Sequence, residues 1–555
     1  MKRKTSKKFV SSAGMAAVLV FGVTACSSPS SNSPANTSSN SSSGGVTAVS
    51  MFASPGGDII NLNTNWFTKY VEKKFNIKIN WVQVPSSDVA TKQSLLLSSG
   101  DYPDVFWSGS FSNADVLKYS QQGILVPLND LIKQYAPNLE KAIQTDPGLK
   151  QDVTAPDGNI YALPGYNYCF HCMWSSKLWI NSALLKKYGL QVPTTTQAFT
   201  QTLEALKQHG ITPLTGDTDG WNGNPTTFLM NSFIYDDGSD YFDVNNGKIT
   251  FAPIQDQWKQ GLEYIHSLYT QGLLDRQAFS QKESIVDREV AQNKVAMVPE
   301  GNFAAVTSVP SIIKNWATMA PLKGPNGVQY ATFYSPVPSG ASFAITNKAS
   351  KTEEIQMMKL LNFIWTPEGT QMLDFGPSGK YWTPAKKGQL GLDGKQALFN
   401  TDWNKFYNGG SQQNEGWDQM GPIDQSEIWR NGGVAVPPYS PSGLTSSLLQ
   451  LETEKNYAGH QPPEVYPGNV WIPTAENQQY AMYQTNIDNF VNQWTSEFIV
   501  GSKSIDKDWN TYVQGVENLG LDQYIKMSQS AMGKPFDTSQ YQPDPKDVKF
   551  LESLK

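Results

Sequence analysis

The chain has 555 residues and a formal net charge of −6, from 43 basic and 49 acidic side chains. This length corresponds to roughly three domains, or to two large ones. Nucleic-acid binders need basic patches in which Arg is favoured, and an acidic chain with four Arg does not fit that class. After residue 25 no apolar stretch approaches the roughly 20 residues that span a bilayer, which excludes a polytopic membrane protein. The aromatic content of 12% remains to be explained.

The first 25 residues have the pattern of a secretory signal peptide. Basic residues at positions 2–8 precede an apolar run over residues 14–23 that is too short for a stable membrane anchor. Small residues at positions 23–25 then precede Cys26, and this order resembles the lipobox of bacterial lipoproteins. The resemblance implies that cleavage leaves Cys26 as a lipid-modified N-terminus. The alternative is an ordinary secretory signal with an incidental Cys.

Residues 26–45 are rich in Ser and Asn, which predicts a flexible tether that holds the following domain off a surface. Removing residues 1–25 takes away five positive charges and no negative ones, so the formal charge changes from −6 to −11. Anionic lipid head groups would repel such a protein. We therefore expect acyl chains such as palmitate on Cys26 to provide the anchor.

From residue 46 onward, short apolar strands alternate with amphipathic helices. We expect strands over residues 46–52, 77–84 and 104–107, and helices over residues 66–75 and 88–99. This alternation predicts a mainly parallel sheet covered by helices. In such sheets a ligand binds beyond the carboxyl ends of the strands.

The same alternation restarts after Tyr161, without an internal repeat of fixed period. It predicts two α/β lobes better than a tandem array. The expected strands are 295–298 and 343–346, and the expected helices are 178–188, 197–208, 254–271, 351–365, 479–500, 505–519 and 523–532.

Cys169 and Cys172 are the two cysteines that follow Cys26, in the sequence Cys-Phe-His-Cys. A local disulfide, a pair of buried thiols and a metal site with His171 are the alternatives. Zinc usually takes four ligands from two such motifs, and the chain has no second one. We therefore favour thiols or a disulfide over a metal.

Four segments, in this order along the chain, resemble those of the extracellular solute-binding proteins of family 1. They are SSGDYPDVF at residues 98–106, DGNIYALP at 157–164, LWINSALLKKYGLQVPTT at 178–195 and FIVGSKSIDKDWNTYVQGVENLGL at 498–521. The last resembles the tail of a long subgroup of Gram-positive lipoproteins.

The resemblance implies a two-lobed, type II periplasmic-binding-protein-like α/β fold, with hinge segments and a ligand cleft between the lobes. It implies a monomer on the outer face of the cell membrane that captures a carbohydrate, mostly an oligosaccharide, and delivers it to the permease subunits of an ABC importer. It implies no cofactor, no nucleic-acid partner and no catalytic residue. We expect lobe 1 at 46–164 with a later segment near 335–400, and lobe 2 at 165–334 with a helical part near 401–555.

Sugar rings present apolar faces that stack on aromatic side chains, and their hydroxyls need Asp, Glu, Asn and Gln as partners. On these grounds we expect Trp107, which follows the strand 104–106 where a ligand-facing loop should begin, to face the ligand. Asp104, at the start of that strand, either fixes the local turn or contacts the ligand. The polar loop 216–224 surrounds Trp221 with turn residues, which favours stacking by Trp221, with Asn222 beside it. For each aromatic candidate the alternative is packing in the core.

Glu300 and Phe303 follow the 295–298 strand in a turn that resembles the family's Gly-x-aromatic element, whose aromatic lies under a sugar. The remaining candidates lie in Gly- and Pro-rich stretches or near the first hinge: Trp382, Trp417, Tyr166 and Trp174.

Some members of the subgroup carry a calcium loop, and Asp217-Thr218-Asp219-Gly220 is its nearest counterpart here. It lacks the spaced ligands and the closing Glu of such a loop, so we expect no metal. The main rival function is a surface glycoside hydrolase or lyase, for which two carboxylates suffice. A sugar-sensing partner of a membrane receptor kinase is the other rival. Neither a Gly-x-Ser-x-Gly nor a His-Glu-x-x-His motif is present.

Overall fold

The computed structural model describes residues 45–56, 59–335, 340–407 and 413–555. The predicted signal peptide and the lipidation site Cys26 lie outside the described residues. Val46–Lys555 form one compact unit by themselves. Among the described residues, none of the helices combines the length and the apolar character needed to cross a bilayer.

A five-stranded sheet organises the N-terminal part of this unit, in the order β2-β1-β3-β11-β4. β1 runs parallel to β2 and β3, while β11 is antiparallel to both β3 and β4. The carboxyl ends of β1, β3 and β4 therefore meet at one edge. The strands are β1 (Thr47–Ala53), β2 (Ile77–Gln83), β3 (Val105–Phe106), β4 (Ala162–Leu163) and β11 (Phe343–Ile345).

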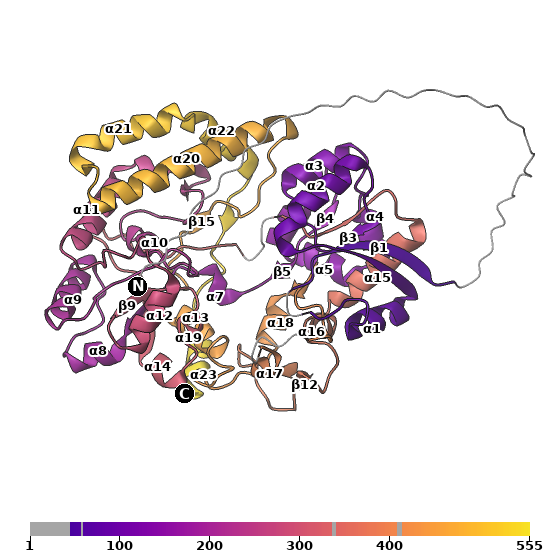
Figure 1. Ribbon diagram of the computed structural model, residues 1–555, viewed down its shortest axis with the longest axis horizontal. Coiled ribbons are helices and arrows are strands. Elements are labelled where there is room, and N and C mark those ends of the chain that lie inside the picture. Colours follow the sequence, from indigo (N-terminus) through magenta and orange to yellow (C-terminus); the bar gives the residue numbers. More distant parts are fainter. Residues whose placement is uncertain (1–44, 57–58, 336–339, 408–412) are drawn as a thin grey trace, which may run out of the picture. The chain divides into compact units, whose positions relative to one another are not determined.

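Both faces of this sheet are covered. Successive side chains of a strand point to opposite faces, and Val105 accordingly packs in one core cluster while Phe106 packs in another. We call these two clusters and their elements the first lobe. Figure 1 shows its late helix α15 beside its first helix α1. The helices are α1 (Trp66–Phe75), α2 (Val89–Ser99), α3 (Asn113–Gln121), α4 (Asn129–Tyr135), α5 (Pro137–Thr145), α6 (Pro147–Val153), α15 (Lys351–Ile364), α16 (Pro367–Phe375), α17 (Trp403–Tyr407) and α18 (Glu427–Asn431).

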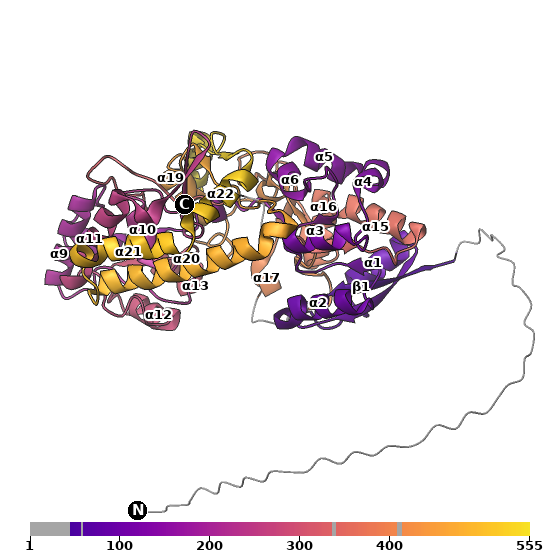
Figure 2. The same ribbon diagram turned by 90° about the horizontal axis from the view of Figure 1, so that it is seen from above.

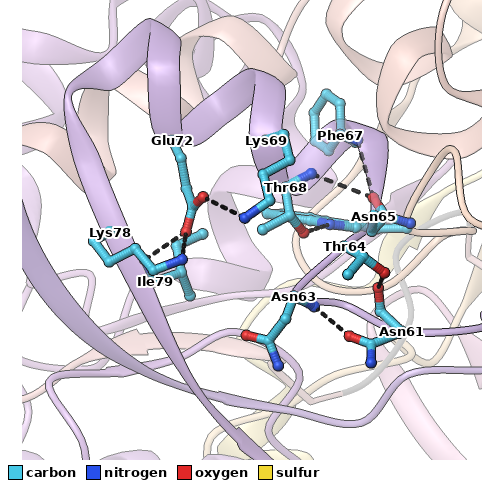
Figure 3. Close-up of polar contacts among 11 residues, drawn as sticks. Asn61, Asn63, Thr64, Asn65, Phe67, Thr68, Lys69, Glu72, Lys78 and Ile79 are labelled. Atoms are coloured by element: carbon cyan, nitrogen blue, oxygen red, sulfur yellow. Dashed lines mark hydrogen bonds and ion pairs between the residues drawn. The ribbon is translucent and has the colours of Figure 1, made fainter.

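Helix α1 begins and is held in place through side chains that the sequence supplies locally (Figure 3). Asn65 is its N-cap, and the Asn65 side-chain oxygen accepts hydrogen bonds from the backbone N–H groups of Phe67 and Thr68. Near the other end, the Glu72 carboxylate accepts from Lys78 Nζ at 2.8 Å and from the Ile79 N–H at 3.2 Å, which ties α1 to β2.

The second lobe is built around a three-stranded sheet in the order β10-β6-β9. Ile180 of β6 packs in one core cluster and its neighbour Trp179 in another, so this sheet is also covered on both faces. The strands are β6 (Leu178–Asn181), β9 (Met297–Pro299) and β10 (Trp316–Met319). The helices are α7 (Phe170–Met173), α8 (Ser182–Lys187), α9 (Thr196–Gln208), α10 (Pro225–Met230), α11 (Asp256–Thr270), α12 (Glu283–Ala291), α13 (Phe303–Val306), α14 (Pro310–Ile313), α19 (Ser447–Asn456), α20 (Thr474–Val500), α21 (Ile505–Asn518), α22 (Leu521–Met532) and α23 (Pro545–Ser553).

Short strand pairs and 3₁₀ turns complete the described structure. The pairs are β5 (Tyr166–Asn167) with β14 (Asp424–Gln425), β7 (Phe242–Asn245) with β8 (Lys248–Phe251), β12 (Trp382–Pro384) with β13 (Phe399–Thr401), and β15 (Glu464–Val465) with β16 (Phe536–Asp537); the 3₁₀ turns are η1 (Ser86–Asp88) and η2 (Ala252–Ile254).

The expected helix over residues 178–188 is wrong at its start. Leu178–Asn181 form β6, and α8 begins only at Ser182. These first residues pair with both β9 and β10, and this pairing overrides their helical periodicity. Asn181 marks the boundary, because its side chain accepts a hydrogen bond from the Leu184 N–H as the N-cap of α8.

The chain passes between the two lobes three times. It leaves the first lobe after Tyr166, returns before Phe343, and leaves again after Trp429. The described residues of 403–407 and 413–430 pack in the first lobe, where Phe406, Trp417 and Trp429 join its core. The sequence-based boundary near residue 400 had placed this stretch with the second lobe. Aromatic side chains that fill the first-lobe core account for the difference.

Candidate functional site

A cavity of about 1130 Å³ opens at the carboxyl edge of the first-lobe sheet. The first lobe contributes the loop that follows β3 and the residues just before β11. The second lobe contributes Tyr334, the loop 466–472 and one side of α20. The principal lining residues are Gly109, Ser110, Phe111, Asn113, Asp115, Ser342, Asp240, Tyr334, Tyr466, Asn469, Asn477, Tyr480 and Gln484.

The lining of this cavity is rich in groups that bind hydroxyls. It combines carboxamides, two carboxylates and three tyrosines, and the described residues that line it include no Lys, Arg or His. Carboxamides can both donate to and accept from hydroxyls, and carboxylates accept from them. The arrangement therefore suits an uncharged ligand with many hydroxyl groups and offers no cationic clamp for an acidic one.

Two of these groups are held in place by each other. Gln484 Nε2, on α20, donates to Asp240 Oδ1 at 2.8 Å. Asp237 lies nearby and is buried, and its Oδ1 accepts from the N–H groups of Ser239 and Tyr241. Burial raises the pKa of Asp240 and of Asp237 above their ordinary values. The wall therefore presents acidic oxygen atoms whose geometry is fixed by the loop.

The loop 466–472 is fastened to the first lobe. Asn113 Nδ2 on α3 donates to Asn469 Oδ1 at 2.7 Å and to the carbonyl of Val470 at 2.8 Å. Asn469 Nδ2 donates in turn to the carbonyl of Asp152 at 3.3 Å. Figure 2 shows the neighbouring end of α20 beside α3. One wall of the cavity is thus a bridge between the lobes.

A smaller cavity of about 260 Å³ adjoins the large one at Tyr334, which lines both. We call it the side chamber. It lies among α10, α11, α20 and the loop 236–241. Its other lining residues are Asn222, Asn224, Thr226, Thr227, Asp236, Gly238, Tyr241, Trp258, Phe279, Asn492, Thr495, Ser496 and Ile499.

Trp221 projects from the loop 216–224 of the second lobe with 43% of its surface exposed. Its ring lies against Gly301, where a Cβ atom would come within 2.6 Å of the indole, so only Gly fits there. The Gly301 N–H donates to the Trp221 carbonyl at 2.8 Å. The ring of His171 approaches edge-on, with centroids 6.2 Å apart. Trp221 is therefore oriented by the protein while its other surface stays free.

Residues 61–371, more than half of the chain, match the model of a family described as bacterial extracellular solute-binding protein. The chain belongs to this family.

Relatives with established names support this assignment. The chain is 25% identical to the fructooligosaccharide ABC transporter substrate-binding protein FusA of Streptococcus pneumoniae over 489 residues, which are 84% of this chain and 86% of that one. It is 24% identical to lipoprotein LipO of Bacillus subtilis over 53% of this chain and 58% of LipO.

Solved structures of solute-binding proteins share the fold. The structure of S. pneumoniae FusA in complex with kestose has a TM-score of 0.68 at 22% identity, and covers 87% of this chain and 98% of that one. An extracellular solute-binding protein from Bifidobacterium longum subsp. infantis has a TM-score of 0.72 at 18% identity, and covers 88% and 99%. The expected type II, two-lobed α/β fold is thereby confirmed.

In this solute-binding protein, two of the predicted ligand aromatics belong to the first-lobe core instead, and Asp104 fixes a turn. Trp107 is fully buried, and its Nε1–H donates to the carbonyl of Met420 at 3.0 Å. Trp417 is also fully buried and donates to Thr68 Oγ1. Asp104 accepts from the N–H and the hydroxyl of Ser50, which fixes the turn into β3.

The turn after β9 is buried as well. Phe303 packs in the core between Trp179 and Trp316, with ring centroids 5.1 and 4.7 Å away, rather than under a ligand. Glu300 is fully buried, its Oε1 accepts from the Asn302 N–H, and its Oε2 has no partner among the described residues. Burial raises the pKa of Glu300 to about 8, and burial lowers that of Lys177 to about 7.

The three remaining aromatic candidates are buried too. Trp382 donates its Nε1–H to the carbonyl of Gly376. Tyr166 donates its hydroxyl to Asp146, and Trp174 donates to Gln461 Oε1 at 3.2 Å. Of the candidates, Asn222 lines the side chamber, with a positive φ of 62°. Trp221 is exposed beside it in the chain but is not among the residues that line either cavity.

Sequence reasoning missed Tyr334, Asp240 and Gln484, which line the large cavity. One signal for them was available. Gln484, Asp488, Asn492 and Ser496 recur every four residues along a predicted helix, which places a polar stripe on one face of α20.

Cys169 and Cys172 form a disulfide, one of the two states that the sequence favoured. Together with His171 they make the one group of three potential metal-ligating residues that lies within 4.8 Å among the described residues. The disulfide occupies both sulfur atoms, so thiolate ligands are not available in this state.

The segment that approximates a calcium loop uses its carboxylates internally. Asp217 Oδ1 accepts from the N–H groups of Asp219 and Gly220. Asp219 accepts from the Glu283 N–H at 2.8 Å and forms an ion pair with Lys282. These bonds shape the loop that carries Trp221.

Proposed function

We propose that this protein captures an oligosaccharide outside the cell and delivers it to the permease subunits of an ABC importer. The observation that carries the proposal is the cavity of about 1130 Å³, with its amide, carboxylate and tyrosine lining. A volume of this size lies at the upper end of small-molecule sites. The names of the relatives, which include a fructooligosaccharide-binding protein, agree with a sugar ligand.

The binding step uses groups that are already oriented. Asp240 and Gln484 meet sugar hydroxyls, the exposed indole of Trp221 stacks on an apolar sugar face, and hinge motion at the three crossings closes the lobes. No bond of the ligand is made or broken. The importer recognises the closed form.

We further propose that the mature protein is a monomer held at the extracellular face of the cell membrane by acyl chains on Cys26. The lipobox-like order of residues 23–26 and the Ser- and Asn-rich stretch behind it support this anchor, and so does the relative named lipoprotein LipO. Mass spectrometry of the N-terminal peptide from membranes should find diacylated Cys26, and an unmodified N-terminus would contradict the anchor.

A ligand screen by thermal shift tests the binding function. A ligand that binds only the native state raises its stability by RT ln(1 + [L]/Kd). We expect the melting temperature to rise with an oligosaccharide, while chromatography of the same mixture shows the sugar intact. Cleavage products would instead support the rival surface hydrolase or lyase. If the protein binds the sugar but cells that lack the protein take up that sugar normally, the result would support the rival function as a sugar-sensing partner of a membrane receptor kinase.

A further inference from the structure

The Cys169–Cys172 disulfide is a feature that the binding function does not yet use. It lies in the first crossing between the lobes, which runs from Tyr166 in the first-lobe core to Trp174 in the second-lobe core. Lobes open and close through a few hinge residues whose backbone dihedrals change. The position of the disulfide relative to the bonds that hold this crossing therefore matters.

The crossing is bonded to the first lobe as far as Tyr168. Its N–H donates to the carbonyl of Gln425 at 2.9 Å, directly after the pairing of β5 with β14. From α18, Arg430 Nε donates to Asn167 Oδ1 at 3.0 Å. Residues 166–168 therefore move with the first lobe.

The crossing is bonded to the second lobe from His171 onward. The buried Lys177 donates through Nζ to the carbonyl of His171 at 2.6 Å and to that of Trp174. The carbonyl of Met173 accepts from the Tyr334 N–H at 2.8 Å. Residues 171–174 therefore move with the second lobe.

Cys169 and Phe170 lie between these two sets of bonds, and we call them the swivel. The disulfide bridges the swivel, because it joins Cys169 to Cys172 on the second-lobe side, with their Cα atoms 5.1 Å apart. A disulfide keeps two Cα atoms within about 7 Å, whereas residues three positions apart in an extended chain reach about 10 Å. The disulfide therefore limits how far the chain can extend at the swivel.

A cavity of about 300 Å³ lies beside the disulfide. Cys169 and His171 line it together with Arg430 and, from α19 of the second lobe, Gln450. Burial lowers the pKa of His171 well below its ordinary value, and the charges of Lys177 and Arg430 lower it further. Positive charge thus acts at this site, and positive charge also stabilises a thiolate that leaves a disulfide.

We propose that Cys169–Cys172 is a reversible redox modification site, at which an extracellular dithiol reductant releases the swivel and weakens ligand binding. The effect on the ligand rests on the proposed sugar-binding function, whereas the effect on the swivel does not. The cavity beside Cys169 is the route by which we expect the reductant to reach the disulfide.

The reaction is a thiol–disulfide exchange. A thiolate of the reductant attacks one sulfur atom, the S–S bond breaks, and the other sulfur leaves as a thiolate that takes up a proton. The second thiol of the reductant then closes its own disulfide and releases the first cysteine as a thiol. Two electrons and two protons pass from the dithiol to the cysteine pair.

The released swivel gives the two lobes more open arrangements. A ligand that is clamped between lobes needs the closed arrangement, and its apparent affinity falls in proportion to the fraction of protein that is competent to bind. Reduction should therefore weaken binding, although neither cysteine lines the large cavity.

Calorimetry on oxidised, reduced and re-oxidised wild type tests the proposal. Wild type is first screened with kestose, maltotriose and cellotriose, and the tightest ligand is used. We expect dithiothreitol to add two thiols per chain without denaturant, to weaken binding at least threefold, and re-oxidation by diamide to restore the affinity. A disulfide that resists dithiothreitol in the native protein, or a reduced protein with unchanged affinity, would overturn the modification site and leave the sugar-binding function intact.

Cys169→Ser/Cys172→Ser is the matched control for the reductant. We expect it to bind like reduced wild type and to be indifferent to dithiothreitol. A dithiothreitol effect of the same size in the variant would place the effect elsewhere in the chain and overturn the proposal. The comparison of reduced with re-oxidised wild type needs no variant, so it decides the question even if the variant folds poorly.

Small-angle X-ray scattering of the ligand-free protein tests the swivel without a sugar. We expect a larger radius of gyration after reduction, and its return to the starting value after re-oxidation. Identical scattering in the two states would overturn the swivel. If wild type binds none of the sugars in a wider panel, the proposed function fails, and the scattering still decides whether the disulfide restrains the lobes.

Discussion

Trp107 and Trp221 both lie in loops, one in each lobe, and have opposite environments. Trp107 directly follows β3, at the carboxyl edge of the first-lobe sheet, and is 0% exposed. Trp221 lies in the loop 216–224 of the second lobe and is 43% exposed. Position in a loop therefore does not decide whether a tryptophan is exposed.

The difference comes from chain that is distant in sequence. Trp107 is covered by residues 417–421, and its Nε1–H donates to Met420, 313 residues later. Gly421 has a φ of 94°, and a Cβ atom there would clash with the Trp107 indole. Trp221 has Gly301 against one side of its ring and the edge-on ring of His171 nearby, and it stays 43% exposed. Residues 417–421 therefore bury Trp107, whereas no comparable segment of the described chain covers Trp221.

Among the variants considered, removal of the Trp417 ring that covers Trp107 should have the largest effect on stability. Trp417 makes edge-on contacts with Phe67, Trp81 and Trp107, at centroid distances of 4.9, 5.5 and 5.2 Å. Trp417→Ala should lower the free energy of unfolding by about 3–5 kcal/mol, because a large buried ring is lost. Urea denaturation followed by circular dichroism measures it. A loss below about 1 kcal/mol would mean that this edge is not closed as described.

The buried carboxyl beside Trp221 should give a pH dependence. The pKa of Glu300 is raised by burial to about 8, against 4.5 for the exposed group. Its contribution to stability is therefore complete below pH 4.5 and is lost as the pH rises toward 8. Burial lowers the pKa of Lys177 to about 7, so well below that pH the lysine is protonated in both the folded and the unfolded chain and does not change stability with pH.

Glu300→Gln should match wild type near pH 5 and be more stable at pH 7 by on the order of 2 kcal/mol. Urea unfolding at pH 5, 6 and 7 compares the two proteins. Parallel pH profiles would show that Glu300 ionises freely in the native state.

The disulfide beside His171 should have a smaller effect. Its cysteines are three positions apart, so it closes a very short loop. Cys169→Ser/Cys172→Ser should lower the free energy of unfolding by about 2 kcal/mol or less, since loop-closure entropy grows with loop length. Dithiothreitol should shift the melting temperature of wild type and leave that of the variant unchanged. A shift in both would point to another cause.

The smallest effect on stability is expected for the exposed Trp221. Trp221→Ala should leave the free energy of unfolding within about 0.5 kcal/mol, as for other exposed positions. It should weaken oligosaccharide binding about tenfold, or by about 1.4 kcal/mol, because the stacking face is lost. Calorimetry with the tightest sugar measures it, and Trp221→Phe is the control that keeps a ring. Full affinity in Trp221→Ala would make this tryptophan a surface residue without a binding role.

Local patterns in the sequence were sufficient for most of the elements. The helix expected over 66–75 has those bounds as α1, and the strand expected over 46–52 appears as β1 (Thr47–Ala53). The failure at Leu178–Asn181 has a tertiary cause, because two partner strands that lie more than a hundred residues later impose the strand.

The site was harder to predict than the fold. A polar loop around an aromatic residue identified Trp221 and Asn222, whose surroundings are local. The same reasoning failed for Trp107 and Trp417, because each is buried by the other and by chain far away. Tyr334 and Gln484 line one cavity through the packing of α20 against an inter-lobe crossing, and no local pattern contains that contact.

The position of β11 determines the order in which the protein can assemble. This strand lies between β3 and β4, yet it is made of residues 343–345, after most of the second lobe. A chain that emerges from its N-terminus first therefore holds β1 to β4 without the strand that joins β3 to β4 until most of the second lobe has followed. The second lobe in turn waits for α19 to α22. The second-lobe sheet β10-β6-β9 is complete by residue 319, so the first-lobe sheet, although it starts earlier in the chain, is completed later.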